Sequence, residues 1–160
     1  KIWDVASETV QWSASTSKNV DCLAWSPDGK LLAAGMGVWD VAQRKLLYEE
    51  PRPGTGHSVA WHPQGNVLAV GADESWYLLK RDDWSVVHQE QISRGGEALA
   101  YSPDGAQIAV THGESVTIWD SNGETKRAQL NGHRRPVVSV SWSPDGRRLV
   151  TADNIREIKS

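Results

Sequence analysis

The sequence predicts an all-β protein built of four-stranded antiparallel sheets, and three observations predict it. A segment with an aromatic residue, a tight turn and an apolar run occurs four times: "AWSPDGKLLAAG" from Ala24, "AWHPQGNVLAVG" from Ala60, "AYSPDGAQIAVT" from Ala100 and "SWSPDGRRLVTA" from Ser141. The aromatic residue recurs at spacings of 36, 40 and 41. No stretch shows the period of an amphipathic helix. A repeat of about forty residues therefore indicates an array of one small structural unit.

The first strand of each unit ends at the aromatic residue. An apolar residue stands two positions before it, and because strand side chains alternate with a period of two, both share one face. These pairs are Leu23 with Trp25, Val59 with Trp61, Leu99 with Tyr101 and Val140 with Trp142. With nine Trp and no Phe in the chain, we expect these rings to fill the space between neighbouring sheets.

A tight turn follows the first strand. Pro fixes φ at the first central position of a type I turn, Asp tolerates the second, and Gly adopts the left-handed conformation that closes the hairpin. The four turns contain Pro27, Pro63, Pro103 and Pro144. We interpret all four as structural.

Three more strands complete the unit. The second, such as "KLLAAG" or "AQIAVT", is apolar on both faces and is expected between two other sheets. The third ends in Trp-Asp at Asp4, Asp40 and Asp120, with Leu79 and Lys80 in the corresponding places of the middle unit. The fourth, in "TVQWSAS", "KLLYEE", "WSVVHQE" and "TKRAQLNG", is polar, as suits an outer edge. Between Trp25 and Trp39 the unit is four residues short, which predicts one missing turn.

The repeats divide the 160 residues into one domain of about four units' worth of chain. We expect the end of a unit at 1–17, three complete units at 18–54, 55–94 and 95–133, and the first three strands of another at 134–160. The third strand of that last unit would lie near Ser160.

Composition and charge limit the functional classes. The net charge of −3 gives no overall attraction for phosphate backbones, so nucleic acid is not the expected partner. No apolar stretch approaches the ~20 residues of a membrane span. Cys22 is the only cysteine, which excludes an internal disulfide and is typical of a reducing compartment, so we expect a cytoplasmic protein.

Catalytic and metal sites are not predicted. The five His residues fall in different parts of the repeats, and none pairs with Cys or carboxylates at a metal-ligand spacing. Adjacent carboxylates, as in "RDD" and "YEE", point to opposite sides of a strand or lie in solvent. No glycine loop for phosphate is present. We therefore expect no catalytic residue, cofactor or metal ion.

The repeat length, the SPDG turn, the Trp-Asp pair and the Gly-His pair in "NGHRRPVVSVSW" resemble the WD-repeat family, whose units are the blades of a β-propeller. The resemblance implies a hydrogen-bond set among that His, a second-strand Ser or Thr, a turn Asp and the Trp. This set is incomplete: one unit has Thr111 and Trp119 without the His, and the last has His133 and Thr151 with Lys159 in place of Trp. We expect the blades to rely on packed rings instead.

The resemblance also implies a ring, of which this chain is expected to be an arc. The remaining blades would come from the same protein or from a second copy. Two other arrangements stay open: the last strands capture the opening fourth strand, "TVQWSAS", and close a four-bladed ring, or two arcs join as an eight-bladed dimer.

One recurring feature suggests a binding site. Basic residues stand seven to nine positions before the first-strand aromatic residue, in the connections between blades: Lys18, Arg52, Arg94, Arg134 and Arg135. Corresponding positions lie on one rim, so these side chains would form an arc of cations for an acidic or phosphorylated protein or peptide. The alternative is that they are ordinary polar loop residues.

The expected function is thus a non-catalytic protein-interaction scaffold, the sensor part of a larger signalling protein. The alternatives are a propeller enzyme with a hydrolytic or metal site in the central channel, and an arc that assembles with copies of itself.

Overall fold

The computed structural model describes residues 1–16, 19–51, 56–92 and 95–154, and these residues form strands and no helix. Three antiparallel sheets have four strands each, in the order of the chain. They consist of β3 (Leu23–Trp25), β4 (Leu31–Ala34), β5 (Gly37–Asp40) and β6 (Lys45–Glu49); β7 (Gly56–Trp61), β8 (Val67–Ala72), β9 (Ser75–Lys80) and β10 (Val86–Gln91); and β11 (Gly95–Tyr101), β12 (Gln107–His112), β13 (Ser115–Asp120) and β14 (Lys126–Asn131).

Two smaller sheets flank the complete ones. One pairs β1 (Ile2–Asp4) with β2 (Thr9–Trp12), and the other pairs β15 (Val137–Trp142) with β16 (Leu149–Asp153). The third strand expected after β16 falls on residues 155–160, outside the described residues. Within the described residues β2 pairs with β1 alone, so the expected alternative in which β2 closes a four-bladed ring is not the observed arrangement.

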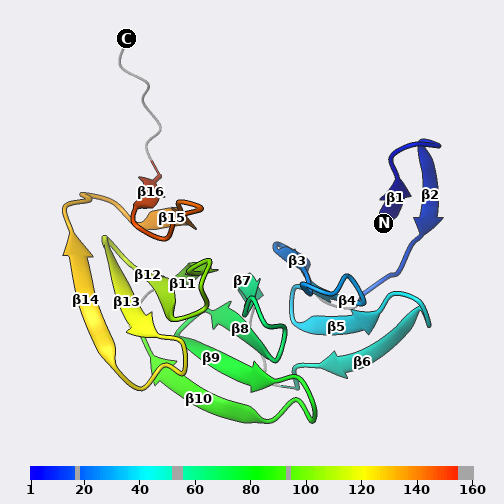
Figure 1. Cartoon of the computed structure of the whole chain (residues 1–160), viewed down its shortest axis with the longest axis horizontal. Coiled ribbons are helices and arrows are strands. Elements are labelled where there is room, and N and C mark those ends of the chain that lie inside the picture. Colours follow the sequence, from blue (N-terminus) through cyan, green and yellow to red (C-terminus); the bar gives the residue numbers. More distant parts are fainter. Residues whose placement is uncertain (17–18, 52–55, 93–94, 155–160) are drawn as a thin grey trace.

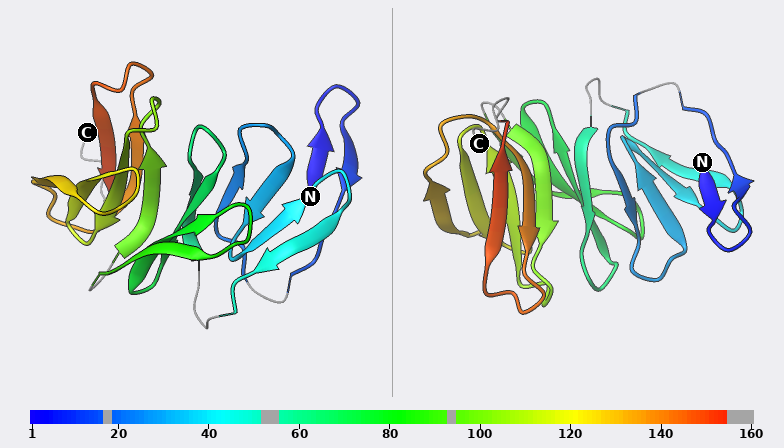
Figure 2. Two further views of the ribbon diagram at one scale, coloured as in Figure 1. Left: turned by 60° about the horizontal axis from the view of Figure 1, so that its bottom comes forward. Right: turned by 90° about the horizontal axis from the view of Figure 1, so that it is seen from above.

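The five sheets stand side by side as an open arc (Figure 1). In each complete sheet the first strand lies on the inner side of the arc and the fourth strand on the outer side. The small sheets lie at the two ends, and the sheets do not close into a ring. In the right view of Figure 2 the hairpin turns that join first and second strands lie along one edge of the arc.

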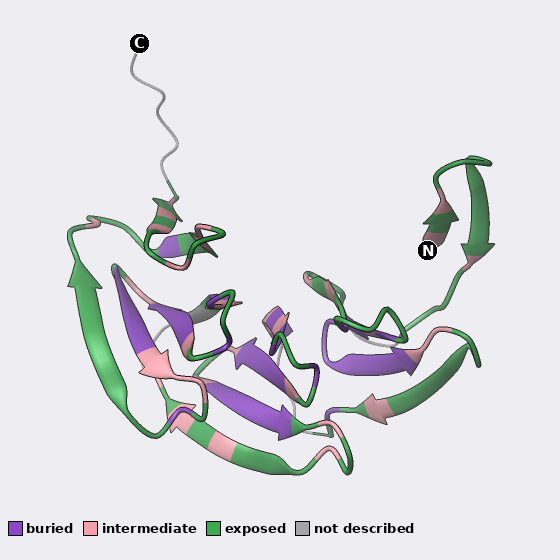
Figure 3. Ribbon diagram, viewed as in Figure 1, coloured by how far each residue is buried: buried purple, intermediate pink, exposed green. Residues whose placement is uncertain are grey.

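Burial follows the predicted order of strands (Figure 3). In the three complete sheets the second and third strands are mostly buried, as in β8 and β9, because they lie in the middle of the arc of sheets. The fourth strands are polar and exposed, and β14 is exposed at every residue. Three apolar clusters lie between neighbouring sheets, so the core of this protein is a series of interfaces.

The predicted turns are confirmed. Their glycines, Gly29, Gly65, Gly105 and Gly146, have φ between 68° and 73°, which favours residues without a Cβ. In the first turn the amide of Gly29 donates to the carbonyl of Ser26 at 2.8 Å, and the Ser26 hydroxyl donates to Asp28 at 2.6 Å. The Asp28 carboxylate accepts from the Lys30 amide at 3.1 Å and the Ser26 hydroxyl oxygen accepts from the Leu31 amide at 2.9 Å, so side chains bind backbone groups of the turn.

The prediction of a missing turn between Trp25 and Trp39 is wrong. A two-residue connection, Gly35 and Met36, joins β4 to β5, and connections of the same length join β8 to β9 and β12 to β13. The difference lies in the strands, because β4 and β5 have four residues each where β8 and β9 have six. Gly35 also packs closely, since a Cβ there would lie 2.9 Å from the carbonyl oxygen of Asn19.

The prediction that the four aromatic rings pack between sheets holds for three of them. Trp61 is 8% exposed, and Tyr101 and Trp142 are half-buried, but Trp25 is 49% exposed. Trp25 differs because the sheet on its side has only the two strands β1 and β2, which leave its ring uncovered.

Candidate interaction surfaces

The structure describes two of the five predicted cations. Arg134 and Arg135 are adjacent and exposed in the connection from β14 to β15. Lys18, Arg52 and Arg94 lie outside the described residues. The arc of cations therefore stays a prediction, with Arg134 and Arg135 as its described members.

Hydrogen bonds anchor the connection that carries these arginines. The His133 ring bonds the Thr151 hydroxyl through Nε2 at 2.7 Å and the Asp153 carboxylate through Nδ1 at 2.8 Å. Further along, the amide of Val137 donates to the carbonyl of Gly113 at 2.8 Å. Arg134 and Arg135 thus project from a backbone that is fixed on both sides.

The partial hydrogen-bond sets implied by the resemblance have two outcomes. The contact between His133 and Thr151 is confirmed. Thr111 does not contact Trp119 in this way: its hydroxyl accepts from the amide of Ala98 at 3.0 Å, and the Trp119 indole donates to Thr117 instead, also at 3.0 Å. Without a His in this unit, the threonine is free to satisfy the backbone of β11.

The same edge of the arc also carries acidic residues, which the repeat pattern does not single out. Connections between sheets lie beside the turns that join second and third strands, as the bond from the Ile92 amide to the Glu74 carbonyl at 2.8 Å shows. Those turns contain Asp73, Glu74 and Glu114. Asp73 contacts His57 Nε2 at 2.6 Å. The charge of the described part of this edge is therefore mixed.

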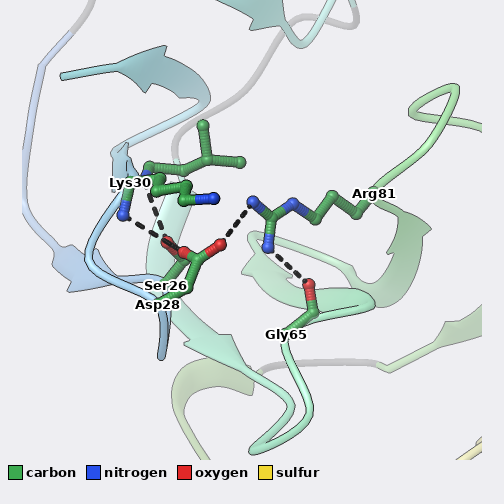
Figure 4. Close-up of polar contacts among 6 residues, drawn as sticks. Ser26, Asp28, Lys30, Gly65 and Arg81 are labelled. Carbon is green, nitrogen blue, oxygen red and sulfur yellow. Dashed lines mark hydrogen bonds and ion pairs between the residues drawn. The ribbon is translucent and has the colours of Figure 1, made fainter. Parts of the chain in front are cut away.

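The opposite edge carries an ion pair between two sheets (Figure 4). Arg81, after β9, donates through Nη2 to Asp28 Oδ2 at 2.8 Å and through Nη1 to the Gly65 carbonyl at 3.2 Å. The Ser26 hydroxyl and the Arg81 guanidinium, in that order, hold the pKa of Asp28 well below its ordinary value. The contact joins the turns of neighbouring sheets, and no local pattern in the sequence signals it.

An apolar groove of about 430 Å³ lies between the β1–β2 sheet and β3–β5. Its lining includes Trp3, Trp12, Leu23, Trp25, Leu32 and Trp39. Trp3 is 57% exposed and Leu23 is 66% exposed. The sequence predicted an opening unit of only two strands, beside which such a groove can form. It did not predict that the aromatic rings of the groove would be exposed.

No group of three or more His, Cys, Asp or Glu side chains in the described part of the chain could hold a metal ion. Among the same residues, no helix has the length and apolar character needed to cross a membrane.

Comparisons with known proteins agree with the architecture. The profile of the family "WD domain, G-beta repeat" matches residues 7–40 and 124–154. The chain is 39% identical over 54 residues to the "COMPASS component SWD3" of Saccharomyces cerevisiae, covering 33% of this chain and 17% of that protein. It is 48% identical over 63 residues to the "WD repeat-containing protein SL1-17" of Schistosoma mansoni, covering 38% of this chain and 20% of that protein.

A solved structure shows the same fold over most of the chain. A chain in the "Crystal Structure of Mitotic Checkpoint Complex" superposes with a TM-score of 0.77 and 28% identity, covering 87% of this chain and 47% of that one. The present chain thus spans at most a fifth of these curated relatives and about half of the solved one. The chain thus contains WD repeats in the two matched regions, and its radially arranged four-stranded sheets resemble the blades of a WD-repeat β-propeller.

Proposed function

We propose that this chain is a non-catalytic interaction scaffold that binds an acidic or phosphorylated protein segment through Arg134 and Arg135. The proposal rests on the exposure of both side chains on a connection that His133 anchors to β16. A fixed backbone lowers the conformational entropy lost on binding, so two adjacent guanidinium groups on it are a preorganised site for anionic groups. Lys18, Arg52 and Arg94 would extend the site along the edge.

The relatives support a role in assemblies. One is by name a component of COMPASS, and the solved chain is part of a checkpoint complex. We extend the proposal to a sensor part of a larger signalling protein and to a cytoplasmic location, for which the unpaired Cys22 is the supporting feature.

The acidic side chains of the same edge set the selectivity of this site. Glu114 and Asp73 stand on neighbouring turns and repel a long polyanion. A short segment with one phosphate or two carboxylates can reach Arg134 and Arg135 without passing them. A compact acidic peptide is therefore the expected ligand class, in preference to nucleic acid.

The test is a binding titration with fluorescent peptides that carry one phosphoserine, two glutamates or neither, at two salt concentrations. We expect the anionic peptides to bind and the neutral peptide to fail. The double variant Arg134→Glu with Arg135→Glu should weaken binding at least tenfold and remove its dependence on salt.

The matched control is Arg147→Glu. Arg147 is exposed in the turn between β15 and β16, at the opposite end of the same hairpin, so it changes charge without touching the proposed site. Equal weakening by both variants would show general electrostatic attraction, and unchanged affinity in the double variant would reject the site.

A further inference from the structure

Asn or Asp stands directly before Gly at five places in the chain: Asp28-Gly29, Asp104-Gly105, Asn122-Gly123, Asn131-Gly132 and Asp145-Gly146. Such pairs are chemically labile, because the glycine amide nitrogen has no side chain beside it and can attack the side-chain carbon of the preceding residue. The nitrogen must first lose its proton and turn toward that carbon. A hydrogen bond that fixes the amide therefore suppresses the reaction.

Turns fix four of these five glycine amides. Each donates to the carbonyl three residues earlier: Gly29 to Ser26 at 2.8 Å, Gly105 to Ser102 at 2.9 Å, Gly123 to Asp120 at 3.0 Å and Gly146 to Ser143 at 2.8 Å. The turn has to open locally before such an amide can react.

The amide of Gly132 is the exception. Within the described residues it makes no hydrogen bond, whereas its equivalents after β6 and β10, Glu50 and Ile92, donate to the carbonyls of Met36 and Glu74. Gly132 has a φ of 144°, and a Cβ there would meet no atom within 4 Å. Asn131 and Gly132 are both exposed, so hydroxide and water can reach the pair.

The side chains of the two asparagines differ in the same sense. Asn122 Oδ1 accepts from the amide of Glu124 at 3.0 Å, and Asn122 Nδ2 donates to Glu124 Oε2 at 3.1 Å, so this carboxamide is held at both ends. Asn131 Oδ1 accepts from Gln129 Nε2 at 3.2 Å, and in the described part of the chain Asn131 Nδ2 has no partner. Gly123 is buried, in contrast to Gly132.

We propose that Asn131 is a site of spontaneous deamidation. The deprotonated Gly132 nitrogen attacks Asn131 Cγ, an N–C bond forms, and the side-chain nitrogen leaves as ammonia, which gives a five-membered succinimide. Water then opens either C–N bond of that ring and yields aspartate or isoaspartate. One water is consumed for each ammonia released, and no redox partner is needed.

The isoaspartate product changes the backbone of the connection from β14 to β15. It adds one CH₂ group to the main chain between β14 and His133. Asn131 pairs with Ser115 on one side of this group, and His133 bonds Thr151 and Asp153 on the other. Both contacts cannot keep their geometry across a longer chain, so the connection loosens.

Both products also place a carboxylate near Arg134 and Arg135. This charge lowers the attraction of the connection for anionic groups, and deamidation would therefore weaken peptide binding over time. That consequence rests on the proposed function. The modification itself is measured by mass and stands without it.

The test is peptide mass spectrometry of the whole chain after incubation at pH 6 and pH 8. Trypsin cuts after Lys126, Arg127 and Arg134, so Asn122 and Asn131 fall in separate peptides. We expect Asn131 to gain the mass of an NH₂-to-OH exchange, faster at the higher pH, and Asn122 to react at least about tenfold more slowly, because its turn must open first.

Two controls separate structure from sequence. In concentrated urea the turns are lost, and the two asparagines should react at similar rates. Asn131→Gln should remove the fast reaction, because attack would need a larger ring, whereas the matched change Asn122→Gln should leave it. An Asn131 that stays intact while the urea sample reacts overturns the proposal, as does an Asn122 that reacts equally fast in the folded chain.

The effect on the connection is tested on the aged protein, separated from the parent by ion exchange. Amide exchange at Val137 should be faster in the isoaspartate fraction than in Asn131→Asp, which adds the charge without lengthening the chain. Equal exchange in the two proteins would overturn the loosening. Failure of peptides to bind Arg134 and Arg135 would reject the proposed function and leave the modification unaffected.

Discussion

The indole nitrogen of Trp142 donates a hydrogen bond of 3.0 Å to the carbonyl oxygen of Ala100 in the neighbouring sheet. Trp61 makes the same contact with Ala24. Each of these rings therefore fills the apolar space between two sheets and also satisfies a backbone carbonyl of the inner strand. At the interface between them the ring is Tyr101, which has no equivalent N–H group.

We expect Tyr101→Phe to stabilise the protein. The Tyr101 hydroxyl is buried and has no hydrogen-bond partner among the described residues, and burial raises its pKa. Burying a hydroxyl without a hydrogen-bond partner costs free energy of desolvation that nothing offsets. Removing this hydroxyl should therefore raise the free energy of unfolding by about 1 kcal/mol. Urea unfolding of the two proteins measures the difference.

The control for that experiment is Tyr48→Phe. The Tyr48 hydroxyl donates to the buried carboxylate of Glu50 at 2.8 Å, so its removal should destabilise the protein. Stabilisation by Tyr101→Phe together with destabilisation by Tyr48→Phe would support the assignment of the Tyr101 hydroxyl as unpaired. Destabilisation by both variants would contradict it.

Acid should weaken the contact between the sheets that Asp28 and Arg81 join. The Ser26 and Arg81 hydrogen bonds lower the pKa of Asp28 in the folded chain below its ordinary value of 3.8. Its contribution to stability is therefore present above that value and is lost as the pH falls toward the folded pKa, because the unfolded chain takes up the proton first. Thermal melting between pH 7 and pH 2 should show less acid sensitivity in Asp28→Asn than in the parent.

Asp145→Asn is the matched variant for this measurement. Asp145 occupies the same turn position, and the Ser143 hydroxyl also lowers its pKa, but no Arg81 equivalent contacts it among the described residues. We expect Asp145→Asn to flatten the pH profile less than Asp28→Asn does. If Asp145→Asn flattened the pH profile more than Asp28→Asn, the hydrogen bonds of the turn, and not the contact with Arg81, would account for the acid sensitivity.

Local patterns in the sequence predicted the strands and their turns, because alternation and turn chemistry act within a few residues. The replacement of Trp-Asp by Leu79 and Lys80 was also located correctly: Leu79 is buried between sheets, where the repeat places it. The spacing of the markers showed that one unit is four residues shorter, but it did not show where in that unit the residues are missing. Spacing counts residues between markers and does not distinguish shorter strands from a lost turn.

The remaining features depend on contacts between sheets. Arg81 and Asp28 are 53 residues apart, and either could have pointed into solvent. The exposure of Trp25 depends on how many strands its neighbouring sheet contains. The repeat shows that Trp25 is equivalent to Trp61. Equivalent positions have the same surroundings only where a complete sheet lies beside them, and the sheet beside Trp25 has two strands.

Thr151→Val should loosen the connection that carries Arg134 and Arg135. The substitution keeps the side-chain shape but removes the hydroxyl that bonds His133, and the expected loss is about 1 kcal/mol in the free energy of unfolding. Amide exchange at Val137, which pairs with Gly113, should become faster. Thr151→Ser retains the hydroxyl and should behave as the parent. Slow exchange in both variants would show that His133 does not fix this backbone.

Trp61→Ala and Trp25→Ala measure how much a neighbouring sheet contributes to one position of the repeat. Trp61 is 8% exposed and Trp25 is 49% exposed, so Trp61→Ala should lower the free energy of unfolding by about 3 to 5 kcal/mol. Trp25→Ala should cost less than about half as much, because half of its surface is already in water. Equal losses would mean that Trp25 packs as its equivalents do, and the groove between β1–β2 and β3–β5 would not be open in the single chain.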